Sequence, residues 1–204
     1  MQFELVRNEN GEHQIGGPVP QDFSIPANEF IAGFQYLGYI DNTDPVLAWL
    51  PFKVNLIHPI YTDEYAVYLD YTNPESPTII EPQDTAASTS AFDEIDSNSQ
   101  IVFEAVKVRA EQNDEIDEFE YIGICGEPEW LQEAVIPICP KSGKPMRFVC
   151  QLGSFSEIRA TYSNIEPTPN TAEYFEKLNF WCDGNLYIFM EPTTRTMCYT
   201  MQNT

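Results

Sequence analysis

Prolines interrupt this chain so often that long helices are excluded. Sixteen prolines and ten glycines are spread through 204 residues, and a proline inside a helix removes a hydrogen bond and clashes with the preceding turn. The regular pattern is instead an alternation with a period of two, typical of strands that are half buried in a sheet. We therefore expect a β-rich α+β fold with a few short helices.

Several segments carry the strand pattern. Aromatic and β-branched residues, which favour strands, are concentrated in segments 65–71, 101–109, 146–152 and 184–190. Segments 30–40 and 119–125 are two further predicted strands, and 197–202 is a predicted closing edge strand.

Two short helices are also predicted. Asn170 is a suitable N-cap, with Glu173 three positions later and apolar side chains on one face of the turn that follows. A second helix is expected to start within 127–132, where Pro128 occupies an allowed first-turn position beside carboxylates that favour a helix N-terminus.

The chain has the length of a single globular domain with a substantial core. A polar, acidic segment at 84–100 is a predicted linker between two halves, 1–83 and 101–204. A weak internal repeat crosses this linker, because 34–38 matches 119–123 and 58–69 matches 139–150. Either the halves are pseudo-repeated lobes packed together, or short strand-like strings agree by chance.

Charge restricts the possible partners. The chain has 32 acidic and 10 basic side chains, a formal net charge of −22, which opposes binding to nucleic-acid phosphates and to anionic membrane surfaces. Its longest apolar stretch, 46–50, is far shorter than the roughly 20 residues of a membrane span. A hydrophobic content of 43% excludes a disordered acidic tail. We expect neither a nucleic-acid nor a membrane partner.

Cysteine usage favours a reducing compartment. Cys125, Cys139, Cys150, Cys182 and Cys198 are odd in number and widely spaced, unlike the disulfide framework of a small secreted domain. We expect reduced thiols that pack as small apolar side chains. The N-terminal residues lack the apolar core of a secretory signal, so we expect a cytoplasmic protein.

No catalytic constellation is recognisable in the sequence. His13 lies in a polar, glycine-rich stretch where we expect it to be exposed, and His58 precedes Pro59, where we expect it to pack or cap locally. A Ser-His-Asp or Cys-His unit around His58 is conceivable. However, the sequence has no Gly-x-Ser-x-Gly motif and no glycine-rich phosphate loop. We predict that the protein is not an enzyme and needs no cofactor.

An ordered set of motifs in the second half resembles a known family. A Gly-x-Pro-x-Trp-x-Gln segment from Gly126 precedes Cys139-Pro140, a strand containing Gln151, and a Gly-Asn-Leu-Tyr-Ile-Phe strand from Gly184. Over residues 119–204 this set resembles the YwqG-like family of mostly bacterial proteins, whose function is not established. The resemblance implies curled antiparallel sheets with internal pseudo-duplication, and no catalytic set. The matching positions, which we expect to be structural, are Gly126, Pro128, Trp130, Gln132, Cys139, Pro140, Gln151, Gly184, Tyr187, Phe189 and Gln202.

One departure from the family pattern bears on metal binding. Many relatives have Cys-Pro-x-Cys-Gly, which is similar to half of a zinc knuckle, whereas Ser142 stands at the second cysteine position here. A structural zinc site needs four ligands, and Cys139 has no histidine close to it in the sequence. We expect no metal.

Trp130 has two alternative roles. In one it is buried with its N–H satisfied, next to Gln132, whose side chain caps a backbone group. In the other it is exposed and anchors a partner, as tryptophan does at interface hot spots.

An acidic segment is the candidate partner-binding surface. Its six carboxylates are Glu111, Asp114, Glu115, Asp117, Glu118 and Glu120. They are either solvated loop acids or a docking surface for a cationic protein, since complementary potentials speed association.

These observations lead to competing hypotheses about function. The leading one is a non-enzymatic cytoplasmic protein-binding protein, most concretely an immunity protein that occludes the active site of a basic toxin through the acidic segment and Trp130. The alternative is a small-molecule or peptide-binding module, or an unrecognised enzyme, with a pocket between the two pseudo-repeats. The predicted lining of that pocket is Tyr36, Tyr61, Tyr68, Trp130 and Tyr187. In a third, the acidity only keeps the protein soluble.

Overall fold

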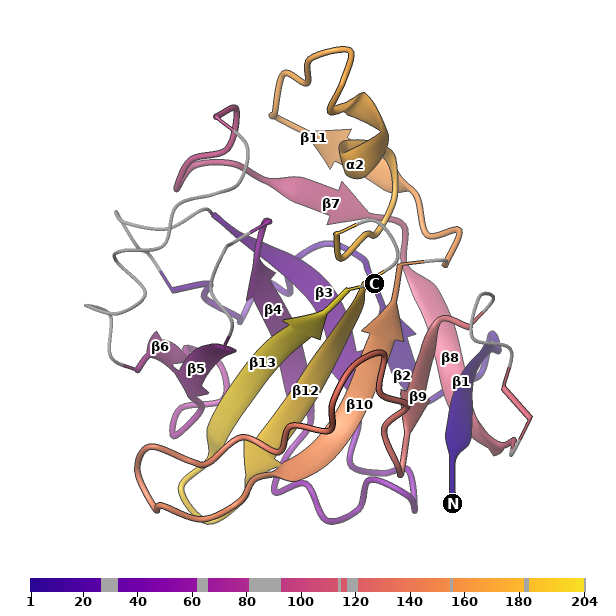
Figure 1. The fold of residues 1–204 in the computed structure, drawn as a ribbon, viewed down its shortest axis with the longest axis vertical. Coiled ribbons are helices and arrows are strands. Elements are labelled where there is room, and N and C mark those ends of the chain that lie inside the picture. The colour runs from indigo at the N-terminus through magenta and orange to yellow at the C-terminus, as the bar shows by residue number, and fades with distance from the viewer. Residues whose placement is uncertain are drawn as a thin grey trace.

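The structure is a computed structural model that describes residues 1–26, 33–61, 66–80, 93–113, 115–116, 121–154, 156–181 and 184–203. Within these ranges, antiparallel strands form one large curled sheet and one small sheet (Figure 1). Across the large sheet the strands lie in the order β4 (Val54–Pro59), β3 (Phe34–Ile40), β2 (His13–Ile15), β8 (Val106–Gln112), β1 (Phe3–Arg7), β9 (Gly123–Cys125), β10 (Arg147–Gly153), β12 (Asn185–Glu191), β13 (Thr196–Gln202), β5 (Ala66–Asp70) and β6 (Thr78–Ile79).

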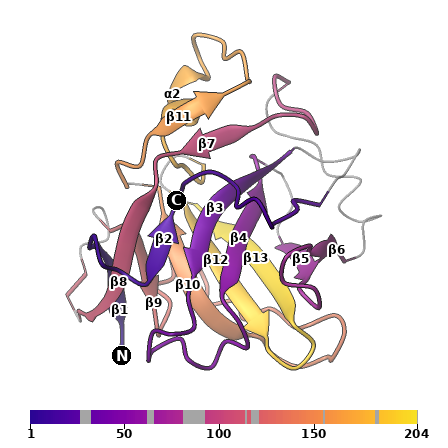
Figure 2. The ribbon, with the colours of Figure 1, turned by 180° about the vertical axis from the view of Figure 1, so that it is seen from behind.

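The small sheet pairs β7 (Ile101–Phe103) with β11 (Ala160–Ser163). Together with the helix α2 (Ala172–Glu176), the small sheet lies beyond the strand ends at the top of the large sheet, as the front and back views both show (Figures 1 and 2). The predicted β-rich fold with antiparallel sheets and few short helices is confirmed.

Two of the predicted strands differ from the structure. The segment 101–109 is divided between β7 and β8, because the chain leaves its partner β11 at Phe103 and then enters the large sheet between β1 and β2. The predicted closing edge strand is an internal one, since β13 pairs with β12 on one side and with β5 on the other. Its side chains are buried on both faces, as an internal position allows.

Both helix predictions need correction. The helix α2 forms, but its N-cap is Thr171 rather than Asn170, and the Thr171 hydroxyl bonds to Glu94 and Thr168 rather than to the helix. The segment 127–132 is irregular and not helical. Its backbone N–H groups at Glu129 and Gln132 donate to side chains of the sheet instead.

The two ends of the large sheet curl toward each other across the core. The Tyr71 hydroxyl, directly after β5, donates to the Asn55 carbonyl of β4 at 2.7 Å and lies 3.2 Å from the Tyr199 hydroxyl of β13. The His58 ring of β4 packs on the Tyr199 ring at 6.0 Å between centroids. The Tyr71 hydroxyl thus supplies a hydrogen bond to a backbone carbonyl of β4 that would otherwise be buried without a partner.

The predicted linker and halves are only partly within the described residues. Of the segment 84–100, the structure describes 93–100. Strands from both halves share the large sheet, because β8 lies between β2 and β1, and β5 pairs with β13. The pseudo-repeat of two lobes stays a prediction.

Candidate functional site

The motif residues of the second half meet around an irregular strap, which we define as residues 126–133. The strap crosses the outer face of β12, where the indole of Trp130 stacks on the Tyr187 ring with centroids 4.8 Å apart and planes 14° apart. The Phe189 ring lies 6.1 Å from the same indole. These rings form a second apolar cluster with Cys139 and Cys198. This cluster buries the outer face of the sheet.

Two buried glutamines hold the backbone of the strap. Gln151 of β10 accepts the Glu129 N–H at 2.7 Å and donates to the Tyr121 hydroxyl at 2.8 Å. Gln202 of β13 accepts the Gln132 N–H at 3.1 Å and donates to the Glu133 carbonyl at 2.8 Å. Each glutamine side chain therefore fixes the strap backbone. In turn it needs the strap as a hydrogen-bond partner, since a buried amide left unpaired costs free energy.

The Tyr187 hydroxyl gives the strap a third anchor. It donates to the Glu129 carbonyl at 2.6 Å and accepts the Leu131 N–H at 3.1 Å. The strap therefore has backbone bonds to three sheet side chains on either side of the Trp130 stack. Trp130 is half-buried in this arrangement, and both of its alternative roles stay predictions.

The remaining motif positions frame the strap. Gly126 begins it, Pro128 lies half-buried within it, and Pro140 is exposed in the following turn. Gly184 precedes β12 where its backbone meets Phe180, and an added Cβ there would lie 1.8 Å from the Phe180 carbonyl oxygen. Only glycine fits this close approach.

Cys139 lies in a tight turn in which Gly143 donates its N–H to the Cys139 carbonyl at 2.8 Å. Burial raises the pKa of the Cys139 thiol, but hydrogen bonds from Ser142, Thr194 and Thr196 outweigh burial and lower the pKa to about 7. Ser142, which stands where the family pattern has a second cysteine, is thus a hydrogen-bond partner of the thiol. Among the described residues, there is no group of three or more His, Cys, Asp or Glu side chains that could hold a metal ion.

The other described cysteines differ from Cys139. Cys125, Cys150 and Cys198 are buried and unbridged, and burial raises the pKa of each thiol, to about 12 for Cys125 and Cys198. Cys182 lies outside the described residues.

Both histidines are buried, which corrects the prediction that His13 is exposed. The Asp41 N–H donates to His13 Nδ1 at 3.0 Å, so the ring proton lies on Nε2, 3.2 Å from Asp44 Oδ2. Burial lowers the pKa of His13 and exceeds the opposing effect of Asp44. The polar neighbours of His13 in the sequence predicted an exposed side chain. The structure instead buries the ring against the loop after β3, where Asp41 and Asp44 lie.

His58 packs in the core, in line with its predicted local role. Burial lowers the pKa of His58 to about 3, against an opposing hydrogen bond to the Pro59 carbonyl. Its ring contacts Tyr199 inside the curl of the sheet.

The acidic segment lies only partly within the described residues. Glu111, at the end of β8, is exposed and pairs with Arg109 at 2.6 Å. Glu115 is exposed, and its N–H donates to the Asn113 side chain. Asp114, Asp117, Glu118 and Glu120 lie outside the described residues.

The five aromatic residues of the predicted pocket occupy three separate places. Tyr68, Trp130 and Tyr187 belong to the outer cluster beneath the strap. Tyr61 packs edge-on against the rings of Tyr174, Phe175 and Trp181 near α2. Tyr36 lines a cavity between β3 and β7.

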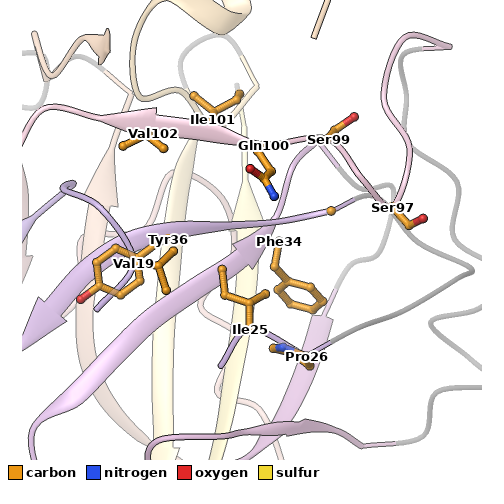
Figure 3. A pocket seen from close by; sticks show the side chains of 11 residues that line it. Val19, Ile25, Pro26, Phe34, Tyr36, Ser97, Ser99, Gln100, Ile101 and Val102 are labelled. Carbon is orange, nitrogen blue, oxygen red and sulfur yellow. The ribbon is translucent and has the colours of Figure 1, made fainter. Parts of the chain in front are cut away.

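The cavity at Tyr36, which we call the β3 cavity, has a volume of about 280 Å³. Its apolar walls come from Val19 and Ile25 before β3, from Phe34 and Tyr36 in β3, and from Ile101 and Val102 in β7 (Figure 3). Gln100 adds a polar side chain on one side, whereas the hydroxyls of the neighbouring Ser97 and Ser99 point away from the apolar side chains (Figure 3). Tyr36 is shared with the predicted pocket, but that pocket was expected to have a different lining, and the residues that line the β3 cavity come from three separate segments.

A close backbone approach shapes one end of the β3 cavity. Gly33 donates its N–H to the Asp96 carbonyl at 2.8 Å, and an added Cβ at Gly33 would lie 2.2 Å from the Ser99 carbonyl oxygen. The Asp96 turn is itself closed, because the Asn98 N–H donates to the Asp96 carboxylate at 2.7 Å. These contacts hold the turn against the start of β3.

The surroundings of the β3 cavity are acidic. Its lining has no basic side chain. Burial and the nearby negative charge of Asp22 are among the causes that raise the pKa of Tyr36, so its hydroxyl stays neutral. Asp96 is exposed directly beside the lining residue Ser97.

Comparisons of the chain with protein-family models, with curated proteins and with solved structures found no match. The resemblance to the YwqG-like family therefore stays a prediction. In the part of the chain that the structure describes, every helix is too short or too polar to cross a membrane.

Proposed function

We propose that this chain is a non-enzymatic cytoplasmic protein-binding protein whose acidic surface docks a basic partner. In its most concrete form it is an immunity protein that covers the active site of a basic toxin. The observation that carries the proposal is that most basic side chains are already bound within the molecule, so that they neutralise little of the acidic surface.

Seven of the ten basic side chains already have a partner within the molecule. Lys53 and Lys107 lie over the Tyr39 ring, Arg147 over the Trp49 ring, and Arg195 over the Phe52 ring. Three further cations form ion pairs, namely Arg109 with Glu111, Lys141 with Asp70, and Lys177 with Glu157. Aromatic rings hold four of these cations and ion pairs hold three, whereas the chain has 32 acidic side chains.

This charge distribution favours fast capture of a cationic protein. A surface of one sign steers an oppositely charged partner and raises the association rate, and it rejects partners of like charge. Glu111 and Glu115 are exposed at one end of β8 and lie within the proposed docking segment. Occlusion of a cleft needs no catalytic group on this chain.

A tagged protein purified from its host at low salt tests the proposal by native mass spectrometry. We expect a stoichiometric complex with a basic protein that dissociates as salt is added. A double variant Glu111→Lys/Glu115→Lys should weaken that complex more than Glu166→Lys/Glu176→Lys, which makes the same change of charge at exposed positions elsewhere. A chain that stays at 23.3 kDa, or equal effects of both double variants, would contradict the proposal.

The second candidate, a small-molecule or peptide-binding module, is supported by the β3 cavity. Its walls join Val19, Ile25 and β3 of the first half to 97–102, which spans the end of the linker and the start of the second half. A thermal-shift screen tests it, because a ligand at 100 times its Kd stabilises the fold by about 2.7 kcal/mol.

A further inference from the structure

We propose that Cys125 and Cys150 are a reversible redox pair, in which hydrogen peroxide closes a disulfide between β9 and β10 at the base of the strap. In the structure both are buried, unbridged thiols. This redox control requires neither the acidic segment nor a protein partner, so it is independent of the proposed function.

The first support is the pairing of the two strands. Cys125 lies directly opposite Cys150 in the antiparallel register of β9 and β10. Farther along β10, the Gly153 N–H donates to the carbonyl of Ile122, which continues the same register. Hydrogen-bonded and non-hydrogen-bonded pairs alternate along an antiparallel ladder. Counting back from Gly153, Cys150 and Cys125 therefore form a non-hydrogen-bonded pair, in which the side chains approach each other more closely.

The spacing of this pair suits a disulfide. Residues in a non-hydrogen-bonded pair have Cα atoms about 4.5 Å apart, and disulfides join Cα atoms about 4.4–6.8 Å apart. Both side chains belong to the main core cluster, on the same face of the sheet. The two thiols also interact electrostatically, because burial and, after it, the nearby Cys125 raise the pKa of Cys150. The two sulfurs can therefore join without a change of strand register.

The second support is the place of the pair at both ends of the strap region. Cys125 directly precedes Gly126, where the strap begins, and Cys150 directly precedes Gln151, which accepts the Glu129 N–H. A disulfide would close the whole segment 126–149 into a loop. Such closure restricts the opened states of the loop, so oxidation should hold the strap more firmly on β12.

Hydrogen peroxide accounts for every atom and electron of the closure. The sulfur of one ionised cysteine attacks a peroxide oxygen, the O–O bond breaks, and hydroxide leaves as a sulfenic acid forms. The second thiol attacks this sulfur, so that the S–S bond forms and water leaves. The pair of thiols thus loses two electrons and two protons, and peroxide is reduced to two molecules of water.

Burial sets the rate of closure, and spacing sets its reversibility. Burial raises the pKa of both thiols, and a buried cysteine is inert until it is exposed. Oxidation should therefore follow local opening of the short strand β9. A Cα spacing at the short end of the disulfide range strains the bond and makes it easier to reduce, which is typical of a regulatory disulfide.

The test exposes the folded, reduced protein to hydrogen peroxide and maps its disulfides by mass spectrometry. Trypsin together with a glutamate-specific protease separates Cys125 from Cys139. We expect the peptides 121–129 and 148–157 to be linked, and millimolar reduced glutathione to separate them. Hydrogen exchange at the Glu129 amide should be several-fold slower in the linked protein, because the closed loop opens less often.

Three variants complete the test. Cys125→Ala and Cys150→Ala should each abolish both the linked peptides and the slower exchange at Glu129. Cys198→Ala makes the same truncation at another buried cysteine of the large sheet, and it should leave both results unchanged. Two pair variants keep the test valid if one of them fails to fold.

The outcomes address the bond and its effect separately. If peroxide oxidises Cys139 while Cys125 and Cys150 stay unlinked, or if they link only after urea unfolds the protein, the redox pair is refuted. If they link in the folded protein but exchange at Glu129 does not slow, the control of the strap is refuted. Neither result bears on the acidic docking surface.

Discussion

Trp130 lies flat on Tyr187, and the Tyr187 hydroxyl bonds to the backbone on both sides of Trp130. One sheet residue thus supplies both the apolar surface and the polar anchor of the strap. The stacked pair turns a long irregular segment into a fixed cover over the outer face of β12.

Trp130→Ala should therefore destabilise the fold by about 2–4 kcal/mol, since truncation of a large aromatic side chain in a packed cluster costs an amount of that order. Trp130→Phe keeps part of the stacking and should cost less. Urea denaturation measures both. A loss below about 1 kcal/mol for Trp130→Ala would show that the strap does not depend on the stack.

Gln151→Met should loosen the strap by a different route. Met has a similar volume but removes the acceptor of the Glu129 N–H and one of the two side chains that bond to the Tyr121 hydroxyl, at a cost of about 1–3 kcal/mol. Hydrogen exchange should accelerate at the Glu129 amide. Gln132→Met, which replaces an exposed side chain of the same strap, is the matched control and should leave that amide protected.

Fold class followed from the sequence more readily than strand order did. Period-two runs placed β3, β5, β10 and β12, whose buried faces dominate their composition. The short polar strands β1 and β2 were missed, because residues such as Glu4 and Gln14 belong to a strand only through their pairing with β8.

The site was predictable only where the residues belong to the ordered set of motifs that carries the family resemblance. The resemblance grouped Trp130, Gln151 and Gln202, which the structure does bring together around the strap. The β3 cavity escaped prediction because Val19, Tyr36 and Ile101 come from distant segments with no shared pattern. The burial of His13 escaped for a related reason, since its partner Asp44 is 31 residues away.

The buried His58 makes stability depend on pH. Burial lowers the pKa of His58 to about 3 in the folded protein, whereas an unfolded histidine has a pKa of about 6.5. Between these values the unfolded chain binds more protons, so stability rises with pH and is lost as pH falls below about 6.5. The cost at pH 5 relative to pH 7 is about 2 kcal/mol.

His58→Phe should remove this contribution. The free energy of unfolding lost between pH 7 and pH 5 should be about 2 kcal/mol smaller in the variant than in the parent protein. His13 and the carboxylates are present in both proteins, so their contributions to the pH dependence cancel in the comparison. Parallel pH profiles would mean that His58 is not buried as a neutral ring.

Cys139 should be the first described thiol to ionise. Its pKa of about 7 lies well below the values near 12 for Cys125 and Cys198. In the folded protein, alkylation followed by peptide mass spectrometry should label Cys139 before the other described thiols as pH rises, because the hydrogen bonds that lower its pKa exist only in the folded turn. Ser142→Ala removes a hydrogen bond that stabilises the thiolate, so labelling should then need a higher pH. Equal onset in both proteins would exclude that role for Ser142.

The association rate constant with the captured basic partner, measured by stopped flow as a function of salt, tests the central claim most directly. Screening shortens the reach of exposed charges from about 30 Å at 0.01 M to about 3 Å at 1 M ionic strength. If the acidic surface steers the partner, the rate should fall about tenfold or more over that range, and Glu111→Lys/Glu115→Lys should flatten the dependence. A rate that is independent of salt would contradict acidic docking.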